Sequence, residues 1–109
     1  MTINKANKKH DSYICSLADE LVKDTRIKDV YTNVVYELGE CDIWIVYNAP
    51  LEEYIEVKCN DTVKGYKKAL DQLTRWCDYM QRMDKNKAYD GRYWTPTYQR
   101  LVIKDGKRV

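Results

Sequence analysis

Three charged residues at the ends of two apolar segments have the types and the spacing to form one reactive cluster. Asp42 opens the first segment, and Glu56 and Lys58 close the second, at about Tyr54 to Cys59. Alternate side chains of a β-strand share a face, so Glu56 and Lys58 project to the same side. If a turn at Asn48-Ala49-Pro50 joins the two strands as a hairpin, Asp42 falls roughly opposite that pair.

Such a cluster disfavours folding unless something compensates its charge. Carboxylates held close together repel and raise each other's pKa, so the arrangement favours a divalent cation. A few hard oxygen ligands with a shell completed by water suit Mg²⁺. A lysine beside a metal-bound water is suited to activate that water or to stabilise negative charge in phosphoryl chemistry.

The motif resembles the core of the PD-(D/E)xK nuclease superfamily. Gly39-Glu40-x-Asp42 matches a frequent form of its first half, although no proline precedes Asp42, and Glu56-Val57-Lys58 follows after thirteen intervening residues. The resemblance implies that Asp42, Glu56 and the backbone carbonyl of Val57 bind Mg²⁺, for which Mn²⁺ can substitute. It also implies that Lys58 acts on the attacking water.

A first helix is expected before these strands, after a polar arm at residues 1–10. Asp11 or Ser12 can cap a helix that runs to about Asp24. Its apolar stripe consists of Ile14, Leu17, Ala18 and Leu21. Glu20 lies at the edge of this stripe, and the resemblance implies that a glutamate on the first helix assists metal binding. The alternative is a solvated helix glutamate.

A second helix is expected at about Val63 to Met83, with Gln72 on the flank of its apolar stripe. Lys68 and Arg75 lie on the same side and could contact phosphate. Gln72-Leu-Thr-Arg-Trp76 is similar to the Q-x-x-x-Y motif that follows the ExK strand in RecB-like and Cas4-like nucleases, with Trp in place of Tyr. We therefore take Gln72 as a site residue and Trp76 as a packing residue.

The remaining pattern completes an α/β domain. A strand is expected at about Asp29 to Leu38, a loop at Lys85 to Pro96 with a turn at Asp90-Gly91, and a last strand at about Tyr98 to Lys104. The order is αβββαβ, a mixed central sheet flanked by helices, which is the restriction-endonuclease-like core that the resemblance implies. It covers residues 1–109 as one domain.

Composition narrows the classes of function. The net charge is only +2, so any affinity for DNA must arise from local arrangement. No apolar run approaches the length of a membrane span and no signal core is present, which predicts a cytoplasmic protein, in the host cytoplasm if it is viral. Four widely spaced cysteines argue against a zinc or iron–sulfur site and predict buried free thiols. His10, the only histidine, is not expected to take part in catalysis.

The sequence therefore predicts a Mg²⁺-dependent DNA endonuclease, with a resemblance to Holliday-junction resolvases that implies a homodimer. The alternatives are a RecB-like nuclease acting on single strands, an RNase, and a non-catalytic nucleic-acid-binding domain on the same fold. Tyr93, Trp94 and Tyr98 could stack on bases, or form part of the core. The frequent use of Lys, Asn and Tyr suggests an AT-rich genome, viral or archaeal.

Overall fold

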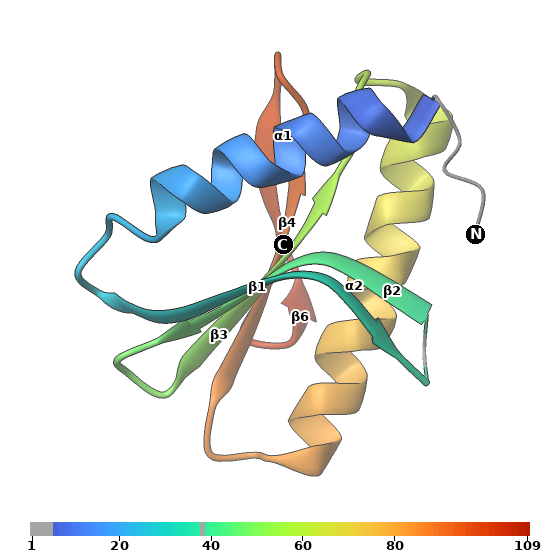
Figure 1. Ribbon diagram of the computed structural model, residues 1–109. Helices are drawn as coiled ribbons and strands as arrows, with labels where there is room; N and C mark the ends of the chain where they lie inside the picture. The colour runs from blue at the N-terminus through green and yellow to red at the C-terminus, as the bar shows by residue number, and fades with distance from the viewer. Residues whose placement is uncertain (1–5, 38) are drawn as a thin grey trace.

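The computed structural model describes residues 6–37 and 39–109. Within these residues the chain forms two helices and six strands (Figure 1). In chain order they are α1 (Ala6–Leu21), β1 (Ile27–Tyr36), β2 (Gly39–Tyr47), β3 (Leu51–Val57), α2 (Val63–Met83), β4 (Ala88–Trp94), β5 (Gln99–Lys104) and β6 (Lys107–Arg108).

The six strands form one mixed sheet in the order β1-β2-β3-β4-β5-β6. All neighbouring pairs are antiparallel except β3 and β4, which are parallel because α2 carries the chain back to the starting edge between them. Ile43 pairs with Ile55 across the β2–β3 hairpin. This register places Asp42 opposite Glu56, as the sequence predicts.

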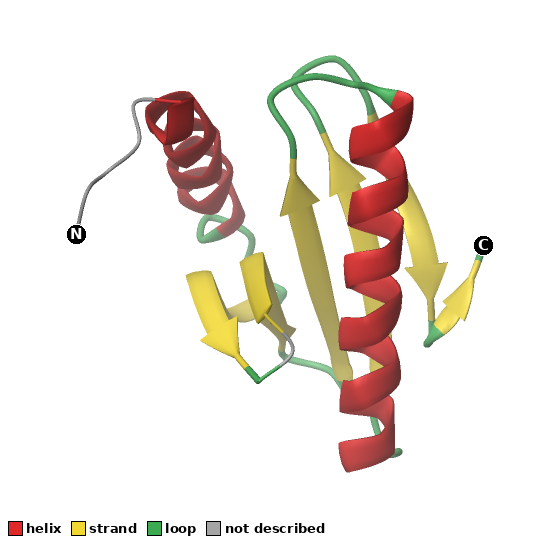
Figure 2. Ribbon diagram, turned by 90° about the vertical axis from the view of Figure 1, so that its right-hand side faces the viewer, coloured by secondary structure: helices red, strands yellow, loops and turns green. Residues whose placement is uncertain are grey.

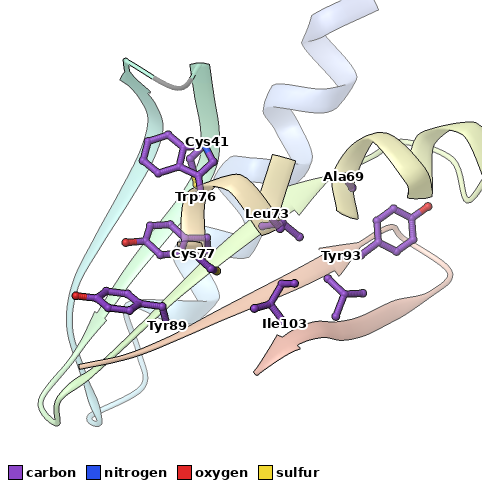
Figure 3. Close-up of a cluster of buried hydrophobic side chains, with 10 residues drawn as sticks. Cys41, Ala69, Leu73, Trp76, Cys77, Tyr89, Tyr93 and Ile103 are labelled. Carbon is purple, nitrogen blue, oxygen red and sulfur yellow. The ribbon is translucent and has the colours of Figure 1, made fainter. Parts of the chain in front are cut away.

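The two helices lie on opposite sides of the sheet (Figure 2). Under α1, Ile14 is fully buried and forms a cluster with apolar side chains of β2 and β3. Under α2, Leu73, Trp76 and Cys77 pack against aromatic and aliphatic side chains from β3, β4 and β5 (Figure 3). The predicted packing role of Trp76 is confirmed, because only 2% of this residue is exposed.

The predicted loop at Lys85 to Pro96 is wrong, since β4 occupies most of it. Along β4, Tyr89, Gly91 and Tyr93 are buried and alternate with the half-buried Asp90 and Arg92, as a strand requires. The pair Asp90-Gly91 is typical of a turn, but here Gly91 lies within the strand, where its lack of a side chain lets Ile103 and Leu73 pack closely against it. A Cβ there would lie 3.1 Å from Cγ1 of Ile103 and 3.2 Å from Cβ of Leu73.

The boundaries of α2 are confirmed, and Thr62 caps it by accepting a hydrogen bond from the Gly65 N–H at 3.0 Å. Val63 does not join the apolar stripe, because 72% of it is exposed. The first helix begins earlier than predicted: residues from Ala6 onward are helical, so neither Asp11 nor Ser12 caps it, and the helix ends at Leu21. Residues 1–5 of the predicted arm lie outside the described residues.

Two further predictions are adjusted by small amounts. Strand β1 covers most of the expected first strand, of which Leu38 lies outside the described residues. Strand β3 ends at Val57, so Lys58 immediately follows it. All four cysteines are free as predicted, but only Cys41 and Cys77 are buried, whereas Cys59 is half-buried and Cys15 is exposed. No helix in the described part of the chain is both long enough and apolar enough to span a membrane.

Candidate functional site

A pocket of about 610 Å³ opens where the start of β2, the end of β3, α1 and the first half of α2 meet. Its lining is almost entirely charged or polar. The lining residues are His10, Glu40, Asp42, Glu56, Lys58, Lys68, Asp71, Gln72 and Arg75. Six of them are residues that the sequence predicts for the site.

Asp42 is buried and held by the neighbouring strand. Its Oδ2 accepts a hydrogen bond from the backbone N–H of Val57 at 2.8 Å, which the hairpin register makes possible. Burial raises the pKa of Asp42, while the Val57 N–H and the nearby His10 and Lys58 oppose the rise. This carboxylate therefore lies at a fixed place with its charge only partly compensated.

Glu56 is the most strongly perturbed carboxyl group of the pocket. Burial, followed by repulsion from Asp42, raises its pKa from 4.5 to about 8, against the attraction of Lys58. The Lys58 Nζ lies 4.0 Å from the Glu56 Oε2, at the outer limit of an ion pair. Lys58 is thus close enough to share a ligand or water with Glu56 and too far to neutralise it fully.

Two other buried carboxylates of this protein each have a close cation. Glu52 forms an ion pair with Lys87, whose Nζ lies 2.9 Å from Oε2, and Glu53 forms one with Arg92, whose Nε lies 3.1 Å from Oε2. Both lie on the same strand as Glu56, nearer the hairpin turn. Among the described residues neither Asp42 nor Glu56 has a lysine or arginine nitrogen this close, although the His10 imidazole lies 3.3 Å from Asp42 Oδ2. Added positive charge would therefore stabilise the end of β3 most.

His10 lines the pocket, a position that the sequence analysis did not predict. Its Nε2 lies 2.8 Å from the carbonyl oxygen of Val57 and 3.3 Å from Asp42 Oδ2. A carbonyl oxygen only accepts, so Nε2 donates in this arrangement. The missed signal is the helical spacing of His10 with Ile14, Leu17 and Leu21, at i, i+4, i+7 and i+11.

Glu20, the predicted helper on the first helix, is not in the pocket. Its side chain is 74% exposed and lies 3.5 Å from Lys23 Nζ. The alternative of a solvated helix glutamate is therefore correct. The contribution of α1 to the pocket comes from His10, at the other end of the helix.

Gln72 links two elements of the pocket. Its Nε2 donates to the backbone carbonyl of Glu40 at 2.8 Å, and its Oε1 accepts from Arg75 Nη2 at 3.0 Å. Gly39 allows this approach, because its φ of +116° suits glycine and a Cβ would lie 3.3 Å from Gln72 Nε2. Gln72 therefore anchors the start of β2 to α2 and orients Arg75.

Four groups could contribute to a cation site: the carboxylates of Asp42 and Glu56, the Val57 carbonyl and the His10 imidazole. Within residues 6–37 and 39–109, no group of three or more His, Cys, Asp or Glu side chains is arranged to hold a metal ion by itself. The donor set nevertheless suits a small divalent cation, because three of the ligands are oxygens. His10 could add its Nε2 as a ligand in the tautomer that carries the proton on Nδ1. The Val57 carbonyl and Asp42 Oδ2 already converge on one atom, the Nε2 of His10.

Comparisons with known proteins do not assign a family. No protein-family model matches the chain, and a search of curated proteins finds no match.

Proposed function

We propose that this protein is a divalent-cation-dependent nuclease that hydrolyses phosphodiester bonds of DNA. The observation that carries the proposal is the pocket at the end of β3. There two buried, poorly compensated carboxylates, Asp42 and Glu56, adjoin the Lys58 ammonium and the cationic side chains of α2. Carboxylates next to cations that face solvent suit a metal ion and a phosphate together.

The arrangement of elements supports the same proposal. A helix, three antiparallel strands, a crossover helix and a strand parallel to the third follow one another, as in the restriction-endonuclease-like core that the sequence motif resembles. Strands β5 and β6 extend the sheet beyond that core. The cation site lies at the carboxyl end of β3, beside the α2 crossover.

The positions of the residues at the end of β3 suggest their roles. Asp42, Glu56, the Val57 carbonyl and His10 would hold Mg²⁺ or Mn²⁺, with His10 in place of the expected Glu20. A bound cation would supply Lewis-acid stabilisation of the phosphate and a more acidic water. Lys58 would orient the attacking water and stabilise the charge that develops on the phosphate oxygens.

The α2 side chains would position the substrate. Arg75 can bind phosphate oxygens through its planar guanidinium, and Gln72 restricts that guanidinium to one orientation. Lys68 adds a second positive charge on the same face of the helix. Gln72 is then a positioning residue, because both ends of its amide are already hydrogen-bonded.

The test is cleavage of labelled single-stranded, duplex, flap and four-way-junction DNA, and of matched RNA, with Mg²⁺, Mn²⁺ or EDTA. Lys58→Ala should abolish cleavage and leave the circular dichroism spectrum unchanged. Lys85→Ala, an exposed lysine outside the pocket, should cut at the wild-type rate. Full activity of Lys58→Ala would refute the assignment. Junction-selective cutting would indicate a resolvase, and cutting of single strands a RecB-like enzyme.

One contact favours a second candidate, a nucleic-acid-binding domain without catalysis. His10 already donates to the Val57 carbonyl and approaches Asp42, so a charged imidazole could take the place of a cation. This candidate predicts DNA binding that EDTA does not change, and no cleavage of any substrate in the panel.

A further inference from the structure

A second hollow lies on the opposite flank of α2 from the pocket described above. It has a volume of about 470 Å³ and lies between the beginning of α2 and the start of β5. Figure 2 shows α2 with β5 and β6 on one side and β1 and β2 on the other. The lining residues are Asp61, Thr62, Val63, Tyr66, Lys67, Leu70, Tyr98 and Arg100, which we call the Tyr98 groove.

Tyr98 is held at the surface of this groove as a fixed aromatic platform. It is 41% exposed, and its ring lies 6.2 Å from that of the fully buried Tyr93. Tyr93 is in turn fixed by a hydrogen bond from its hydroxyl to Asp61 at 2.9 Å and by an edge contact with Tyr66. The Tyr98 backbone bonds to Thr95 through both its N–H and its carbonyl. Little ordering would be needed for a planar ligand to stack there.

Positive charge connects this groove to the catalytic pocket. Lys67 lines the groove and Lys68 lines the pocket, while Lys64 lies between them on the exposed face of α2. None of these three, nor Arg100 across the groove, has an ion-pair partner among the residues that the structure describes. No acidic residue lies in the first turn of α2, and Asp61, just before the N-cap, is the one carboxylate that lines the groove, against the two cations Lys67 and Arg100. The local charge is thus complementary to a polyanion.

We infer that the Tyr98 groove binds an unpaired base of a single-stranded nucleic acid, whose adjoining phosphates cross the lysines of α2 into the catalytic pocket. The inference rests on the proposed function and adds the substrate class to it. Bases within a duplex are stacked on one another and cannot lie on Tyr98, whereas the bases of a single strand can. The distance to cross is about one helix diameter, roughly 10 Å.

The experiment measures binding of a fluorescently labelled oligothymidylate by anisotropy in EDTA, so that cleavage does not interfere. Tyr98→Ala should weaken binding about tenfold or more, because base stacking on one aromatic ring contributes that much. Tyr98→Phe should restore most of it. Tyr31→Ala removes a tyrosine of similar exposure, 44%, on β1, far from the groove in sequence, and should bind as the wild type does.

Several outcomes would overturn the inference. They are no binding of the oligonucleotide, equal binding by wild type and Tyr98→Ala, or an equal loss for blunt duplex DNA. If Tyr98→Ala does not fold, Tyr98→Leu takes its place, because it also removes the aromatic ring, with the same expected selectivity for single strands.

The binding assay also separates this inference from the proposed function. If binding depends on Tyr98 but no cation supports cleavage, the proposed nuclease function is wrong and the inference about the Tyr98 groove stands. If the protein cleaves single strands in the presence of a cation and Tyr98→Ala has the KM of the wild type, the nuclease function stands and the inference about the groove is wrong.

Discussion

At the scale of single residues, the buried carboxyl group of Glu56 couples folding to pH. Its pKa is raised to about 8 in the folded protein, so the neutral form is favoured there. The stabilisation from this group is complete below its unfolded pKa, near 4.5, and is lost as the pH rises to about 8. Burial raises the pKa of Asp42 as well, which gives the same sign.

We therefore expect the free energy of unfolding of the wild type in EDTA to fall from about pH 5 to pH 8. The fall should exceed that of Glu56→Gln by an amount on the order of a few kcal/mol. Urea titrations at both pH values measure it. Added Mg²⁺ should stabilise the wild type at pH 8 and not Glu56→Gln. Parallel pH profiles of the two proteins would contradict the assigned shift.

A second prediction concerns the two candidate ligands on α1. His10→Ala should lower the affinity for Mn²⁺ about tenfold or more, since it removes a nitrogen donor next to Asp42 and Val57. Glu20→Ala is the matched control, because this glutamate is exposed on the same helix. The Mn²⁺ affinity of this variant should equal that of the wild type. Isothermal titration calorimetry measures both. A larger loss for Glu20→Ala would reverse the assignment.

The success and failure of sequence reasoning at this scale have one physical origin. The proximity of Asp42, Glu56 and Lys58 is predictable because all three lie in one hairpin, and its short turn sets the register of the two strands. His10 is not, because its role depends on where α1 begins and how the helix lies against the sheet. Glu20 is ten residues further on, about 15 Å along the helix axis, so the same packing that brings in His10 keeps Glu20 out.

At the scale of elements, the strand that sequence analysis missed determines how closely α2 approaches the sheet. A methyl group at Gly91 would lie 3.1 Å from Ile103 and 3.2 Å from Leu73, both fully or almost fully buried. Gly91→Ala should therefore destabilise the protein by about 1–3 kcal/mol, as overpacking does. Thr97→Ala, in the exposed β4–β5 turn, should change stability little.

Chemical denaturation of both variants is the measurement, and an unchanged midpoint for Gly91→Ala would show that α2 can move away without loss. The same contact explains why β4 reads as a loop from sequence. An Asp-Gly pair usually indicates a turn, and only the tertiary contact with α2 and β5 shows that a glycine is needed within the strand. By contrast, α2 is predictable to the residue because its capping signal and apolar stripe are local.

At the scale of the whole molecule, charge is nearly balanced overall and concentrated locally. The chain has 19 basic and 17 acidic residues, so the long-range field is weak. The lysines of α2, together with Arg75 and Arg100, form the path that we infer for a single strand. Where these charges lie should therefore matter more for binding than the net charge itself.

Salt dependence of oligonucleotide binding tests this directly. Five phosphate contacts would give a slope of about −3.5 in a plot of log binding constant against log salt. Lys64→Gln/Lys67→Gln should reduce the magnitude of the slope by about 1.4, since two contacts are lost. Lys28→Gln/Lys85→Gln changes the net charge equally at two exposed lysines that line neither the pocket nor the Tyr98 groove, and should leave the slope as it is. Equal effects of the two pairs would mean that the overall field, rather than the path along α2, attracts the nucleic acid.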